Sequence, residues 1–255
     1  MSLADTKTRK AVVAGLMAAG CLFSGGSALA QAIVVRSTGP SAAEYPQGRK
    51  LPANASVTLR AGDRLTVLDK AGTRVLSGPG SFALNGAINR NETAGSALAS
   101  LTVRTPGARV RTGAVRGAPL AASTAEANAP DSVWYVDVSK GGTFCVADPT
   151  AVVLWRPNRA SEGAGKLLSA DGSMADVAWK AGSALKLWPV ASVPVVDGQS
   201  YTFSNPVGPT VNIRLKLLAS VPSEDMAVAS VFADNGCNAQ LDVIANSAAP
   251  QASGG

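Results

Sequence analysis

Histidine is absent from the 255-residue sequence, which removes most common catalytic arrangements. A Ser-His-Asp triad, a Cys-His dyad and the usual zinc sites all need an imidazole. Ser183 and Lys186 match the S-x-x-K spacing of the serine β-lactamases. That motif works at the start of a helix, whereas residues 184–188 have the pattern of a strand. We therefore do not expect catalysis there.

Acidic residues are the remaining candidates for catalysis. Those that could form the paired carboxylates of a glycoside hydrolase are Glu162, Asp171, Asp176 and Asp197. Most of them lie in or beside turn sequences, where Asp is common for structural reasons. No glycine-rich phosphate-binding motif accompanies them. The sequence therefore predicts a protein that is not an enzyme, with no metal site and no cofactor.

Positive charge is concentrated in the stretch LTVRTPGARVRTGAVRG, residues 101–117, which contains no acid. Its basic residues are Arg104, Arg109, Arg111 and Arg116. After Pro106 the residues alternate as in a strand, with Val110 on one face. The arginines then form a solvated strand face, a docking face for an acidic protein surface, or a contact for an anionic envelope polymer. Nucleic acid is not expected, because no aromatic residues are interleaved with the basic ones.

Residues 1–30 have the features of an export signal. Lys7, Arg9 and Lys10 precede a short apolar run, and residues 28–30 supply the small side chains that a signal peptidase needs. The run is shorter than the roughly 20 residues of a membrane span. Cleavage before Gln31 predicts a periplasmic or secreted protein with no stable membrane insertion. Lipid attachment at Cys21 and a retained anchor are the alternatives.

Removal of residues 1–30 leaves two cysteines, Cys145 and Cys237. In an oxidising compartment, such a pair is most simply one disulfide. Two free thiols are the alternative, and two isolated cysteines do not make a zinc site. The disulfide would close a long loop and stabilise the fold by roughly 2–4 kcal/mol.

Charge divides the rest of the chain into two halves. Residues 31–120 hold 12 Lys and Arg against 4 Asp and Glu, a net charge of +8. Residues 121–255 hold 8 against 12, a net charge of −4. The stretch 118–132 has the polar, proline-containing composition of a linker. We therefore predict a basic domain at 31–117, an acidic domain at 133–246 and a disordered tail at 247–255.

Both predicted domains alternate apolar and polar residues as strands do. In the basic domain, strands around 57–59, 65–67 and 75 are separated by turns of Gly, Asp and Pro, and a short helix is expected at 93–101. The expected strands of the acidic domain are 133–138, 143–147, 152–156, 166–169, 173–179, 184–188, 199–204 and 211–217. They predict a β-sandwich or an open barrel.

The acidic domain ends in helical sequence. Ser223 is a good N-cap, Asn235-Gly236 is a stop signal, and a second short helix is expected from Cys237. A Cys145–Cys237 disulfide would fasten this helical cap onto the sheet. All four tryptophans lie in predicted strands, which favours core packing. Trp155 and Trp188 are the two that we single out as candidates for stacking on a sugar.

The run LPANASVTLRAGDRLTVLDKAGTRVLSGPGSFAL, with VRTPGARVRTGAVRG after it, resembles the FecR family of periplasmic regulator domains. The matching points are Gly62-Asp63, a glycine turn at 69–72, Thr105-Pro106 and Val115-Arg116-Gly117. The resemblance covers about residues 51–117, and the C-terminal half is not recognised. Ala118-Pro119 departs from the family, which continues with Thr and another strand.

The resemblance implies an all-β periplasmic module that contacts other envelope components. Members of the family reach a sigma factor through a cytoplasmic segment and a membrane span, and signal cleavage would remove both. An anti-sigma role is therefore not expected.

We therefore predict a mostly β, two-domain, exported recognition protein in a cell-envelope signalling or assembly system. Its basic FecR-like domain would contact an envelope protein partner, with an anionic envelope polymer as the second choice. The alternative is an envelope glycan-binding module or a carbohydrate-active enzyme. Exposed, coplanar Trp rings beside paired carboxylates would favour that alternative.

Overall fold

The computed structural model describes residues 32–52, 54–84, 129–206 and 208–247. Its elements are mostly β-strands, with two helices near the C-terminal end, and the predicted β-rich fold is confirmed. Several expectations lie outside the described residues. They concern the export signal with Cys21, the helix at 93–101, the arginines at 104, 109, 111 and 116, most of the linker, and the chain after 247.

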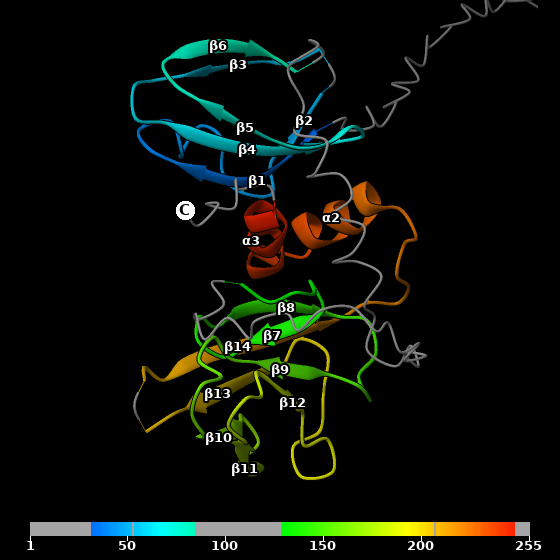
Figure 1. Ribbon diagram of the computed structural model, residues 1–255. Helices are drawn as coiled ribbons and strands as arrows, with labels where there is room; N and C mark the ends of the chain where they lie inside the picture. Colours follow the sequence, from blue (N-terminus) through cyan, green and yellow to red (C-terminus); the bar gives the residue numbers. More distant parts are fainter. Residues whose placement is uncertain (1–31, 53, 85–128, 207, 248–255) are drawn as a thin grey trace, which may run out of the picture.

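The N-terminal strands form a four-stranded antiparallel sheet and a two-stranded ribbon, at the top of Figure 1. The sheet has the order β2-β1-β4-β5, and the ribbon pairs β3 with β6. The bounds are β1 Ala32–Thr38, β2 Lys50–Leu51, β3 Ser56–Leu59, β4 Arg64–Asp69, β5 Gly72–Ser77 and β6 Gly80–Ala83. The glycine turn expected at 69–72 connects β4 to β5.

Strand β1 was not apparent in the sequence pattern because both of its faces are buried. Ala32 and Val34 pack with the apolar residues of β3 and β4, whereas Ile33 and Val35 face the C-terminal helices. A strand buried on both sides is a continuous apolar run and lacks the alternation that marks a half-exposed strand.

Two facing sheets form a sandwich in the C-terminal half, at the bottom of Figure 1. One has the order β11-β10-β13-β14-β8 and the other β12-β9-β7. The bounds are β7 Tyr135–Asp137, β8 Gly142–Val146, β9 Val153–Trp155, β10 Gly163–Ser169, β11 Met174–Trp179, β12 Leu185–Leu187, β13 Ser200–Ser204 and β14 Val211–Leu217. Inward residues of both sheets, such as Leu154 and Ile213, share one core.

Helices α2 (Asp225–Asp234) and α3 (Asn238–Ser247) form a layer between the N-terminal sheet and the sandwich (Figure 1). The predicted stop is confirmed, because α2 ends before Asn235 and Gly236 has a positive φ of 66°. The sequence predicts the helices as a cap on the second domain. In the structure they also pack on Ile33 and Val35 of β1, so the two halves share a core.

A disulfide joins Cys145 of β8 to Cys237, which lies just before α3, and the Cα atoms are 5.8 Å apart. This confirms the predicted pairing. Beside it, the buried Gln240 side chain accepts a hydrogen bond from the backbone N–H of Cys145 (2.6 Å). The Gln240 amide also donates to the carbonyl oxygens of Val133 (2.8 Å) and Cys145 (2.9 Å). Helix α3 is thus held on the sandwich by the disulfide next to it and by the three hydrogen bonds of the Gln240 side chain.

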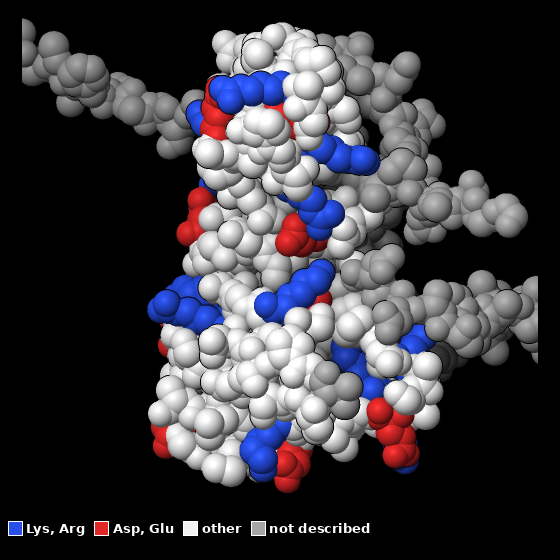
Figure 2. Space-filling view, turned by 90° about the vertical axis from the view of Figure 1, so that its left-hand side faces the viewer, with Lys and Arg blue, Asp and Glu red and all other residues white. Residues whose placement is uncertain are grey.

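Charge also joins the two halves. Arg36 of β1 forms an ion pair with Asp242 of α3 (3.0 Å), and Lys50 of β2 forms one with Asp234 of α2 (2.7 Å). On the face shown in Figure 2, basic and acidic side chains alternate along the molecule instead of forming a patch of one sign. No helix in the described part of the chain is long and apolar enough to cross a membrane.

Candidate functional site

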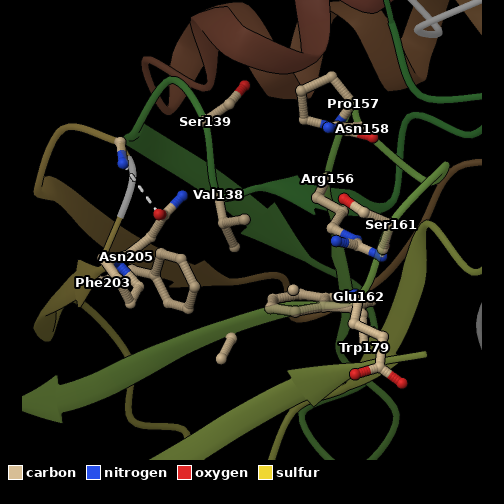
Figure 3. A pocket seen from close by; sticks show the side chains of 14 residues that line it. Val138, Ser139, Arg156, Pro157, Asn158, Ser161, Glu162, Trp179, Phe203 and Asn205 are labelled. Atoms are coloured by element: carbon tan, nitrogen blue, oxygen red, sulfur yellow. Dashed lines mark hydrogen bonds between the residues drawn. The ribbon is translucent and has the colours of Figure 1, made fainter. Parts of the chain in front are cut away.

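A cavity of about 340 Å³ lies at one end of the sandwich, between its two sheets (Figure 3). Strand ends from both sheets contribute its main lining residues, which are Val138, Arg156, Glu162, Trp179, Phe203 and Asn205. Cavities of roughly 300–1,000 Å³ are typical of small-molecule sites. The position fits such a site, because the open end of a sandwich gives access to side chains held by rigid strands.

Arg156 is the charged residue most deeply buried in this cavity, with 9% of its surface exposed. It follows β9, and its Nε donates to the carbonyl oxygen of Ser183 (3.1 Å). Its Nη2 donates to the carbonyl oxygens of Ser161 (2.6 Å), Lys180 (3.2 Å) and Ser183 (3.0 Å). These bonds hold the guanidinium in one place, but carbonyl groups carry no formal negative charge to neutralise it.

The other terminal nitrogen of Arg156, Nη1, makes no hydrogen bond to the described residues. Among the described residues, Nη1 is also not one of the fully buried polar atoms that lack a hydrogen bond, so part of its surface remains accessible. No carboxylate in the described ranges forms an ion pair with this guanidinium. Arg156 therefore offers free donors and an uncompensated positive charge to the cavity.

Two glycines of β10 make room for these groups. A Cβ at Gly163 would lie 2.1 Å from Nη1 of Arg156, and a Cβ at Gly165 would lie 2.2 Å from the Phe203 ring. Residues two apart in a strand share a face. The Gly-Ala-Gly start of β10 thus leaves that face bare where the guanidinium and the aromatic ring lie.

Aromatic rings form a wall of the cavity. The guanidinium carbon of Arg156 lies 5.5 Å from the Trp179 ring centroid, within the range of a cation–π interaction. Trp179 in turn packs edge-on against Phe203, with centroids 5.9 Å apart and planes at 83°. Burial lowers the pKa of Arg156 from its ordinary value, but the group stays charged at physiological pH.

The indole Nε1–H of Trp179 is buried and has no hydrogen-bond partner within the described ranges. A buried donor without a partner costs free energy and calls for an explanation. The ring of Trp179 lines the cavity, but its Nε1 atom has essentially no accessible surface, so this donor does not face a ligand there.

Polar residues surround the entrance. Ser139, Asn158 and Glu162 are exposed there. Figure 3 shows the Glu162 carboxylate directed away from the Arg156 guanidinium. The Asn205 side chain accepts a hydrogen bond from the backbone N–H of Gly208 (2.9 Å). The cavity therefore combines a fixed buried cation, an aromatic wall and a polar rim, which suits it to binding an anionic group.

The two tryptophans that the sequence offered for sugar stacking are in the core. Trp155 and Trp188 are each 3% exposed, and the Trp188 indole donates to the carbonyl oxygen of Val193 (2.8 Å). Neither ring presents a face to solvent, so neither supports stacking on a glycan. Arg104, Arg109, Arg111 and Arg116 lie outside the described residues.

Three of the four acidic candidates have structural roles, and the fourth, Glu162, lies at the rim of the cavity. Asp171 accepts a backbone hydrogen bond from Ser173 (2.9 Å) within its turn, and this bond lowers the pKa of its carboxyl group. Asp197 accepts from the Lys216 ammonium and from the Leu217 N–H (2.8 Å each), and the Lys216 bond is the main cause of its lowered pKa. Asp176 pairs with Lys166 on the surface. Within the described ranges, no cluster of three or more His, Cys, Asp or Glu could hold a metal ion.

Arg156 carries one signal in the sequence, its place directly after an apolar strand sequence. An arginine directly after a buried strand, next to a buried tryptophan, is an unusual position for a charge. Comparison with family models, with curated proteins and with solved structures yields no match for the chain.

Proposed function

We propose that this chain is an exported, non-enzymatic recognition protein of a cell-envelope signalling or assembly system. Its sandwich cavity would bind an anionic group of the partner. The observation that carries this proposal is the Arg156 guanidinium, which is held by backbone carbonyls and keeps Nη1 free.

A buried cation without a carboxylate is costly, because desolvation disfavours its charged form. An anionic ligand would offset this cost and would gain a charge-assisted hydrogen bond. Since Ser161, Lys180 and Ser183 already fix the guanidinium, little conformational entropy is lost on binding. These properties support recognition of an anionic group.

Export is supported by two independent features. Residues 1–30 have the composition of a signal peptide. The Cys145–Cys237 disulfide is typical of proteins outside the reducing cytosol. We therefore propose a periplasmic or secreted location.

The basic FecR-like stretch is proposed as a second contact surface. Its arginines at 104, 109, 111 and 116 would dock on an acidic protein surface, with an anionic envelope polymer as the other candidate. Charge pairing already operates within this chain, because Arg36 and Lys50 pair with acids of α3 and α2.

The test is an affinity capture from solubilised envelope with the mature protein and three variants. One variant carries Arg156→Gln, and a second carries Gln at 104, 109, 111 and 116. The control carries Gln at four exposed basic positions, Arg60, Arg64, Lys70 and Arg214. We expect a partner that the mature protein and the control retain and that each test variant loses or binds more weakly. Equal capture by all four proteins would contradict the proposal.

A further inference from the structure

We infer that the sandwich cavity is a binding site for a carboxylate carried next to an apolar group. A peptide C-terminus with an apolar last residue and a small carboxylic acid share this chemistry. The inference rests on the proposed function, because it names the anionic group that the cavity would recognise.

The charges of the lining favour an anion with a single charge. Arg156 and Glu162 are the only ionisable residues of the lining in the described part of the chain, and Glu162 is exposed at the rim, so one buried positive charge faces the cavity. A phosphate group with nearly two charges is normally bound by several converging cations or backbone N–H groups. Lys180 and Lys186 line a neighbouring hollow and not this cavity. A carboxylate matches the one free guanidinium nitrogen.

The aromatic wall favours an apolar group beside that carboxylate. Trp179 and Phe203 are 4% and 2% exposed and meet edge to face, and Val138 adds an aliphatic surface. An apolar group placed there would leave water, whereas a sugar hydroxyl would need hydrogen-bond partners that these side chains lack. The polar rim at Ser139 and Asn158 is suited to an amide near the entrance.

A purely structural role would leave part of Arg156 unexplained. Its Nε and Nη2 hold the loops that follow β9 and β11, and those bonds account for the burial of the side chain. They do not account for Nη1, whose approach to β10 is made possible by Gly163. Glu162, the nearest acid in sequence, is directed away from it (Figure 3). The free nitrogen is thus left for a ligand.

The experiment is a calorimetric titration of the mature protein with four probes. They are the peptide acetyl-Ala-Ala-Phe, the same peptide with a C-terminal amide, phenylacetate and inorganic phosphate. We expect saturable binding of the free-acid peptide, of phenylacetate or of both. The relative affinity of the two probes shows whether a peptide C-terminus or a small carboxylic acid fits the cavity better. The amide should bind at least about tenfold more weakly, because it loses a charge-assisted hydrogen bond.

Two variants give changes of opposite sign. Arg156→Gln should weaken binding of the acid by at least about tenfold. Glu162→Gln should strengthen it by about threefold, because a negative charge leaves the rim. Glu162 is exposed, so this variant does not endanger the fold. Lys166→Gln, an exposed change in β10, the strand that begins directly after Glu162, should leave binding unchanged and serves as the control.

The inference is overturned if the acid and its amide bind alike, if neither acid binds, if phosphate binds as tightly, or if Glu162→Gln weakens binding. These outcomes are separable from failure of the proposed function. If envelope capture depends on Arg156 but the probes do not discriminate, the proposed function stands and the carboxylate assignment falls. If capture does not depend on Arg156, the proposed role of the cavity falls as well.

Discussion

Gly165 has no side chain, and the Phe203 ring occupies the space that a side chain would fill. A Cβ there would lie 2.2 Å from the ring and 2.9 Å from the carbonyl oxygen of Ser204, a backbone atom that cannot rotate away. We expect Gly165→Ala to lower the free energy of unfolding by about 1–3 kcal/mol, as overpacking does. Urea denaturation measures this. Lys166→Ala, which removes only an exposed ion pair, should change it by less than about 0.5 kcal/mol, and equal effects would contradict this packing.

Turn carboxylates make stability depend on pH. The Thr150 hydroxyl lowers the pKa of Asp148, the Ser173 N–H that of Asp171, and the Lys216 ammonium that of Asp197. A folded pKa below the unfolded value of about 3.9 stabilises the fold above that pH, and the gain is lost as pH falls through the folded pKa. The urea midpoint should therefore decrease below about pH 4.

The control for this pH effect is a variant with Asn at 148, 171 and 197. It should show a weaker loss of stability on acidification, because the groups that take up protons are gone. An unchanged pH dependence would mean that other carboxylates are responsible.

Some single residues were predictable and others were not. The cysteine pair follows from the count of two in the predicted mature chain, and the burial of Trp155 and Trp188 follows from their place in strands. The role of Arg156 was not predictable, because it depends on carbonyl groups at 161, 180 and 183, which the fold brings together from separate loops.

At the scale of elements, α3 depends on one buried amide. Gln240 satisfies the N–H and C=O of Cys145 and the C=O of Val133. Gln240→Ala would leave these groups buried without partners, and each such group costs about 1–3 kcal/mol. We expect a loss of about 3 kcal/mol in the free energy of unfolding. Asn238→Ala, an exposed change on the same helix, should cost less than about 0.5 kcal/mol. Similar losses in both variants would contradict the role of Gln240.

Strands with one buried and one exposed face were predictable from the sequence. A strand that is buried on both faces, and the exact start of a helix, were less predictable. Strand β14 has the predicted bounds, because its apolar residues face the core and its polar residues face solvent. Strand β1, buried on both faces, lacks that signal. The start of α2 also differs: Glu224 occupies the N-cap position, without a side-chain capping bond, one residue after the predicted Ser223. Helix ends depend on local backbone geometry, which composition constrains weakly.

At the scale of the whole molecule, the helical layer gives the two halves a shared core. Phe232 of α2 packs against Trp134 from the sandwich, with centroids 5.4 Å apart, and shares a core with Ile33 and Val35. We expect a single unfolding transition, with far-UV circular dichroism and Trp fluorescence changing together. Since every tryptophan lies after residue 130, fluorescence reports on the C-terminal half.

The variant Phe232→Ala tests this coupling. It should lower the free energy of unfolding by about 3–5 kcal/mol, because loss of the Phe232 ring leaves an empty space in the core that both halves share. The circular dichroism and fluorescence transitions should shift together. Val196→Ala, at an exposed side chain, is the control. A circular dichroism change that precedes the fluorescence change in the unaltered protein would show that the halves unfold separately.

The most direct measurement is an NMR titration of the four Trp indole N–H resonances with the acetyl-Ala-Ala-Phe carboxylate. Trp179 lies in the cavity beside Arg156, whereas Trp134 lies against the helical layer. If the cavity recognises a carboxylate, the Trp179 resonance should shift and saturate, Trp134 should stay in place, and Arg156→Gln should abolish the shift. If the Trp179 resonance does not move, or if the indole resonances all drift without saturation, the central claim is contradicted.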